Sequence, residues 1–146
     1  MVVISSSNSK VSLKDIQEFE ASNKLKFPTE YKSFLLEYNG GYPSPSFFKI
    51  SDKQGISVLN VFYGIGDMYD NLQDFIDIFD ERLPQGFIPI GDDPGGNIIC
   101  ISTEGQYFGN IFFWNHEQES DTPDDMINVY FIASSFTNFL NELYDE

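Results

Sequence analysis

The chain has 146 residues, of which 41% are hydrophobic and 16% are aromatic, including fifteen Phe and eight Tyr. This length suits one domain with its own core, and this composition excludes a disordered or low-complexity chain. The net charge of −15 disfavours nucleic acid and anionic lipid as partners, because both are negatively charged.

The negative charge is unevenly distributed along the chain. Residues 1–53 contain seven lysines and six acids, a net charge of +1, whereas residues 54–146 contain seventeen acids and one base, Arg82, a net charge of −16. Such an excess attracts a basic protein surface over about one Debye length. The alternative is that the acidity only keeps the protein in solution.

The sequence also sets expectations about compartment and cofactors. No apolar run approaches the roughly eighteen residues that a membrane span requires. Residues 1–10 lack the apolar region of a signal peptide and are expected to be frayed. Cys100 is the only cysteine, which excludes an intramolecular disulfide and a Cys-based metal cage. We therefore expect a cytoplasmic protein with no cofactor and no contact with a membrane.

Two helices are predicted near the start of the chain, from their capping signals and their apolar spacing. The first begins after Ser12, an N-cap with Asp15 three residues later, which is a variant of the capping box. The second begins with Pro28 as its first residue and ends at Asn39, Gly40 and Gly41 through a left-handed cap.

Two further helices are predicted to begin near residues 70–71 and 134–135. All four have apolar side chains spaced to form one buried stripe. The expected buried stripes are Leu13, Ile16 and Phe19; Tyr31, Phe34, Leu35 and Tyr38; Leu72, Phe75, Ile76 and Phe79; and Phe136, Phe139, Leu140 and Leu143.

Six short runs between these helices have the character of β-strands. They are residues 47–50, 56–63, 87–90, 97–102, 108–114 and 127–132. The connections Gly91–Gly96 and Thr103–Gly105 are short and rich in turn residues, which favours antiparallel hairpins. The sequence predicts one α+β domain over residues 1–146, with about four helices packed on a single, mostly antiparallel sheet.

A search for catalytic groups finds no nucleophile with a base beside it. His116 is the only histidine and stands next to acids, which is typical of a solvated loop residue, although it could act as a general base. Cys100 lies in an apolar strand run and is expected to fill the core. The acidic stretch Glu117–Asp125 lacks the glycine and terminal glutamate of a calcium loop. We therefore expect no catalytic residue and no metal site.

Three segments together carry a resemblance to a known family. They are Phe27–Gly41, with Pro-x-x-Tyr followed by Asn-Gly-Gly; Phe87–Ile101, with Ile-Pro-Ile-Gly followed by Gly-Gly-Asn; and Ala133–Leu140, with Ser-Phe followed by Phe-Leu. In this order they resemble the SUKH superfamily, which includes the yeast regulator of cell-wall glucan synthesis and many bacterial immunity proteins. The resemblance covers residues 12–144.

The resemblance implies an α+β fold and no catalysis. It also implies an immunity protein, or antitoxin, that binds and neutralises a secreted toxin domain, often a nuclease. A basic toxin surface would complement the acidic chain. Two alternatives stay open: a regulatory scaffold in cell-wall glucan synthesis, and an enzyme acting on carbohydrate through paired carboxylates. The oligomeric state is not predicted.

Particular residues are expected to serve as contacts or as turns. Tyr and Trp are favoured anchors at interfaces, although Trp114 has the alternative of capping the core. The expected contacts with the partner are Tyr42, Asp92, Asp93, Trp114 and Glu117. The expected structural turns are Gly40, Gly41, Gly95 and Gly96.

Overall fold

The structure is a computed structural model that describes residues 2–146. Its helices are α1 (Leu13–Asn23), α2 (Thr29–Glu37), α3 (Leu72–Ile78) and α4 (Phe136–Glu142). Its strands are β1 (Val3–Ser5), β2 (Tyr42–Ser44), β3 (Phe47–Ser51), β4 (Gly55–Val58), β5 (Val61–Phe62), β6 (Phe87–Asp92), β7 (Ile98–Ser102), β8 (Ile111–Trp114) and β9 (Val129–Ala133). Three short 3-10 helices follow later strands: η1 (Gly105–Tyr107), η2 (His116–Gln118) and η3 (Pro123–Asp125). The predicted α+β class is confirmed.

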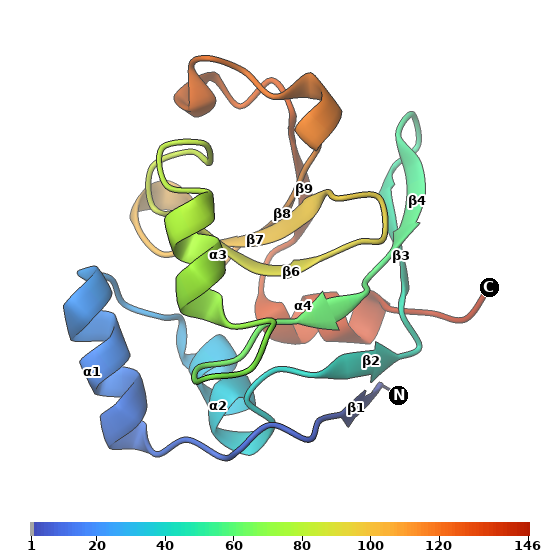
Figure 1. The fold of residues 1–146 in the computed structure, drawn as a ribbon. Helices are drawn as coiled ribbons and strands as arrows, with labels where there is room; N and C mark the ends of the chain where they lie inside the picture. Colours follow the sequence, from blue (N-terminus) through green and yellow to red (C-terminus); the bar gives the residue numbers. More distant parts are fainter. Residues whose placement is uncertain (1) are drawn as a thin grey trace.

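The strands form three antiparallel sheets, shown in Figure 1. One has five strands in the order β5-β6-β7-β8-β9, and β1-β2 and β3-β4 form two smaller sheets. The antiparallel pairing is confirmed, but the prediction of a single sheet is wrong. The run 56–63 divides because the amide of Leu59 bonds to Ser46 O, and that of Asn60 to Asp92 O. The chain therefore changes partner strand between β4 and β5.

Residues 3–5 are ordered, so the expectation of a frayed start is wrong there. Strand β1 pairs with β2, with Ile4 opposite Pro43. Asn39 holds residues 8 and 9 in place. Its side-chain Nδ2 donates to Ser9 O at 2.9 Å, and its backbone oxygen accepts from Asn8 Nδ2 at 2.8 Å. Asn39 is fully buried, and this long-range contact has no local signal in the first ten residues.

The helix starts follow the predicted capping residues closely. Ser12 and Asp15 form a complete capping box, with Asp15 N bonded to Ser12 Oγ at 3.1 Å and Ser12 N bonded to Asp15 Oδ2 at 2.9 Å. Asn71 and Ser135 cap α3 and α4 through their side chains. Pro28 is the N-cap of α2 and not its first residue, a shift of one position.

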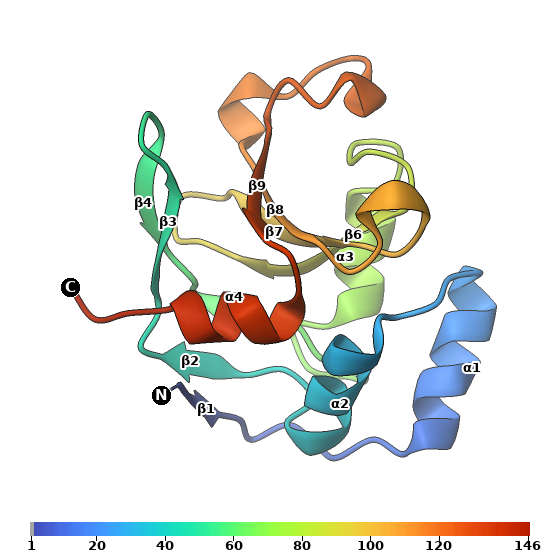
Figure 2. The same cartoon turned by 180° about the vertical axis from the view of Figure 1, so that it is seen from behind.

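The main core lies between one face of the five-stranded sheet and the helices (Figure 2). Phe34 of α2, Phe62 of β5 and Phe136 of α4 meet at its centre, with ring centroids 4.8 to 5.4 Å apart. Ile16 of α1 is fully buried. Leu13 is 48% exposed, so its predicted place in the buried stripe is wrong, because this first helical residue points away from the core.

The opposite face of the sheet, called here the second face, carries a smaller cluster. Alternate residues of each strand point to it, and Leu83 and Phe79 from the segment after α3 pack over them together with Met126. The strand residues of this cluster are Phe87, Ile98, Cys100, Phe112, Trp114 and Val129. Cys100 is fully buried, as expected of a core residue, and burial raises the pKa of its thiol. Loops and short turns, in place of a long helix, cover this face.

None of the helices in residues 2–146 is long and apolar enough to cross a bilayer.

Candidate functional site

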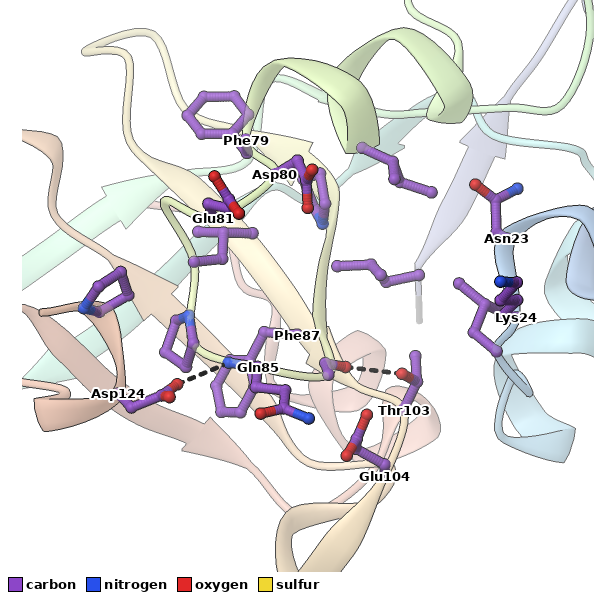
Figure 3. Close-up of a pocket in the computed structure, with 18 residues that line it drawn as sticks. Asn23, Lys24, Phe79, Asp80, Glu81, Gln85, Phe87, Thr103, Glu104 and Asp124 are labelled. Atoms are coloured by element: carbon purple, nitrogen blue, oxygen red, sulfur yellow. Dashed lines mark hydrogen bonds between the residues drawn. The ribbon is translucent and has the colours of Figure 1, made fainter.

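A cleft of about 550 Å³ opens beside the second face of the sheet. Its walls come from the end of α1, the segment after α3, strand β6 and the turn that contains η3 (Figure 3). These segments are far apart in the sequence, so only the tertiary fold creates the cleft.

The floor of the cleft is apolar and belongs to the core. Leu83 is 6% exposed and Phe87 is 9% exposed, and both also pack in the second-face cluster. Ile76 and Phe79 of the α3 region form one side, and Leu25 after α1 forms the other. Leu25, Ile76 and Phe79 are half-buried, so part of each stays accessible to a ligand, whereas Leu83 and Phe87 are almost fully covered.

The rim carries four exposed carboxylates and one lysine. Asp80 and Glu81 lie at one side of the opening, and Asp124, Glu104 and Lys24 lie around the rest (Figure 3). Asp124 Oδ1 accepts a hydrogen bond from the backbone of Gln85 at 2.8 Å, which joins η3 to the cleft wall. The net charge of this rim is therefore negative.

Gly86 allows Glu104 to lie against the backbone of the cleft. Gly86 has φ +82°, and a Cβ placed there would be 2.3 Å from Glu104 Cγ. Thr103 Oγ1 donates to Gly86 O at 2.6 Å, and Thr103 N donates to the same oxygen at 2.8 Å. These bonds fix the β7 end against β6 and place the Glu104 carboxylate at the rim.

Arg82, the only base in residues 54–146, is paired within the molecule. Its Nε and Nη2 donate to the two carboxylate oxygens of Glu119 at 3.0 and 2.9 Å. Its guanidinium also lies 4.6 Å from the ring centroid of Phe79 and 5.6 Å from that of Trp114. Arg82 thus joins the segment after α3 to the segment after η2, and its charge is paired with Glu119 and not with the rim carboxylates.

An apolar floor inside a carboxylate rim suits one kind of ligand group. A lysine or arginine side chain can lay its aliphatic stem on apolar surface while its charged end meets a carboxylate. The titratable side chains that line the cleft are four carboxylates and Lys24. This arrangement favours binding of a cationic side chain.

The structure separates the five predicted contact residues. Tyr42 is 56% exposed on β2, in the small β1-β2 sheet. Glu117 is exposed in η2. Asp92 is half-buried and accepts hydrogen bonds from Asn60 Nδ2 at 3.0 Å and Tyr63 Oη at 2.7 Å. None of the five lines the cleft described above.

Two predicted contact residues are buried, and their expected surface role is wrong. Trp114 is 1% exposed and lies in the second-face cluster, which is the core alternative for this residue. Asp93 is 7% exposed because its carboxylate organises the β6-β7 turn. It accepts hydrogen bonds from Ser57 Oγ, from the backbone of Gly95 and from both the backbone and the side chain of Asn97.

The predicted glycine turns are found where expected. Gly40, Gly41 and Gly96 have φ of +89°, +127° and +88°, in the region that favours glycine, and Gly95 lies in the same turn as Gly96. His116 is exposed, its ring lies over Gly96, and its backbone N–H donates to Asn97 Oδ1 at 3.0 Å. No three His, Cys, Asp or Glu side chains within residues 2–146 are grouped to hold a metal ion.

Sequence reasoning missed two exposed aromatic side chains that pack against the second-face cluster. Tyr107 of η1 makes edge contacts with Phe87 at 6.4 Å and with Phe112 at 5.5 Å, between ring centroids. Phe131 of β9 contacts Phe112 at 5.9 Å and is 56% exposed. The strand-like run of residues 127–132 includes Phe131, but a strand pattern alone does not tell which face of a strand is left uncovered.

Comparison with known proteins gives the class of protein. The model of the SMI1 / KNR4 family (SUKH-1) matches residues 10–142, and the chain belongs to this family. It is also 32% identical, over 90% of its length and 73% of the relative's, to the SPbeta prophage-derived uncharacterized protein YokK of Bacillus subtilis (strain 168). The resemblance that the sequence indicated is confirmed.

Proposed function

We propose that this chain is a non-catalytic, cytoplasmic immunity protein that binds and neutralises a basic toxin domain, such as a nuclease. The observation that carries this proposal is the pairing of Arg82 with Glu119. Because the only base in residues 54–146 is paired with Glu119, exposed carboxylates of that region such as Asp80, Glu81 and Glu104 have no arginine or lysine of that region beside them. Membership of the SUKH-1 family supports a binding role.

Charge and apolar surface have different parts in this mechanism. Exposed carboxylates attract a basic surface at long range and therefore raise the association rate, most strongly at low salt. Apolar side chains that become buried mainly slow dissociation. The cleft offers both, since Asp80, Glu81 and Glu104 surround a floor that includes Phe87.

The test begins in the genes next to that of this chain, where the proposal expects a secreted protein with a C-terminal toxin domain, and it uses that domain. Cells that co-express both proteins are expected to survive, and the purified proteins are expected to form a complex whose association slows as salt is added. The paired change Asp80→Lys with Glu81→Lys should slow association by about tenfold or more at low salt.

A matched control keeps the net charge the same. Asp145→Lys with Glu146→Lys makes the identical charge change at the exposed C-terminal end, which lies away from α1 and α3 in both views. This control should associate nearly as fast as the unmodified protein. Equal slowing by both pairs would mean that only net charge matters, and survival without any complex would overturn the proposal.

A further inference from the structure

A second hollow, of about 670 Å³, lies along α1 between Asp15 and Ser22. It is bounded by the segment of residues 7–11, by α1, and by the loop of residues 65–68 that leads toward α3. Both hollows are lined in part by α1 and by one residue from α3, which is Ile76 in the first hollow and Gln73 in the second.

One hydrogen bond separates the two hollows. Asn23 near the end of α1 lines the first hollow, and Gln73 near the start of α3 lines the second. Asn23 Nδ2 donates to Gln73 Oε1 at 2.8 Å and to Phe19 O at 3.0 Å. The hollows are therefore neighbours divided by this pair of polar side chains, and the two hollows with the pair between them are called here the α1–α3 groove.

Apolar side chains line the groove along its length. Phe19 lies in the second hollow and Leu25 in the first, and both are half-buried and packed against the main core. Ile76 and Phe79 line the first hollow from α3 and the segment after it, and are also half-buried. Each of these side chains retains exposed area that a bound segment could cover.

The groove is strongly acidic. Its carboxylates come from both hollows and outnumber its lysines. The carboxylates are Asp15, Glu18, Asp67, Asp80, Glu81, Glu104 and Asp124, and the lysines are Lys10 and Lys24. Lys10 donates from Nζ to the backbone oxygen of Glu37, and Lys14 lies 4.0 Å from Glu18 at the surface. The remaining charge is negative at both ends.

We propose that one extended, lysine- or arginine-rich segment of the partner lies along the α1–α3 groove and seats a basic side chain in each hollow. The proposal rests on the proposed function and adds where and how the partner binds. From Asp15 to Leu25, helix α1 and its cap extend about 15 Å, which an extended chain of about five residues covers. A short segment is therefore long enough to reach both hollows across Asn23 and Gln73.

The proposal predicts which surface changes block the partner. Ser22→Trp places an indole in the second hollow, and Gln85→Trp places one in the first. Gln17→Trp, on the opposite side of α1, and Gln106→Trp, in η1, add the same side chain outside the groove and serve as controls. All four positions are exposed, so denaturant unfolding of each variant should match the unmodified protein.

The measurement is the Kd of the toxin domain used to test the proposed function, together with the binding of short overlapping peptides that cover that domain. Each groove variant should raise the Kd of the toxin domain by about tenfold or more, and each control should raise it by less than about twofold. One basic peptide should bind the unmodified protein and lose binding to both groove variants.

The outcomes separate the two proposals. If the domain binds and neither groove variant raises its Kd, the groove inference is overturned while the proposed function stands. If two different peptides each respond to only one variant, the hollows are separate sites and the single-segment inference is overturned. If the domain does not bind the unmodified protein at all, the proposed function itself fails.

Discussion

Arg82 and Glu119 form a bidentate ion pair that joins the segment after α3 to the segment after η2 across the second face of the sheet. The hydrogen bond and charge of Glu119 raise the pKa of Arg82, and those of Arg82 lower the pKa of Glu119. The guanidinium also lies over the rings of Phe79 and Trp114. This contact fixes two loops that no long helix covers.

The pair is expected to contribute measurably to stability. A double-mutant cycle of Arg82→Ala and Glu119→Ala should give a coupling free energy of about 1 kcal/mol, above the value typical of exposed pairs because the contact is bidentate. Both side chains are partly exposed, at 41% and 30%, which limits the gain. Urea unfolding of the four proteins provides the measurement. A coupling near zero would show that solvent screens the contact fully.

The same coupling should depend on pH in one direction. The pKa of Glu119 in the folded protein is lowered from 4.5, so its stabilising contribution is complete above that value and is lost as pH falls through the folded pKa. The coupling should therefore be full at about pH 7 and much smaller at about pH 3. In Glu119→Gln this pH dependence should disappear. If the coupling free energy stayed the same at acid pH, it would come from packing of the two side chains and not from their charges.

Two Tyr→Phe changes are expected to have opposite effects. Tyr31 is fully buried, and its hydroxyl has no hydrogen-bond partner within residues 2–146, so Tyr31→Phe should raise the free energy of unfolding by about 1 kcal/mol. Tyr63 Oη donates to Asp92 Oδ2 at 2.7 Å, so Tyr63→Phe should lower it by about 1.5 kcal/mol. Denaturant unfolding of both variants provides the measurement. If both changes shift the free energy of unfolding in the same direction, the different roles given to the two hydroxyl groups are contradicted.

Trp114 and Tyr42 are expected to differ as a core and a surface residue. Trp114→Ala should reduce the free energy of unfolding by about 3–5 kcal/mol, because it empties part of the second-face cluster. Tyr42→Ala should change it by less than about 0.5 kcal/mol, since the side chain is 56% exposed. Trp114 is the only tryptophan, so its fluorescence in the unmodified protein should shift to longer wavelength on unfolding. An unshifted spectrum would place it in water in the folded state.

Local signals in the sequence determined where the helices begin and that the β6-β7 hairpin is antiparallel. Ser12 with Asp15, Asn71 and Ser135 cap helices through groups within three residues of each other, so their roles are visible in one short stretch. The turn at residues 91–96 likewise required antiparallel pairing of its flanking strands, which the structure has. The family, too, was recognisable from the order of such segments.

Only the tertiary structure decided which polar and aromatic side chains are exposed and which are buried. Trp114 and Asp93 have the residue types of an interface, yet both are buried, because the segment after α3 covers the one and the β6-β7 turn encloses the other. The cleft and the α1–α3 groove combine α1, α3 and, at the cleft, residue 124. Exposure and concavity depend on contacts between residues that are distant in the chain, and a linear pattern does not contain them.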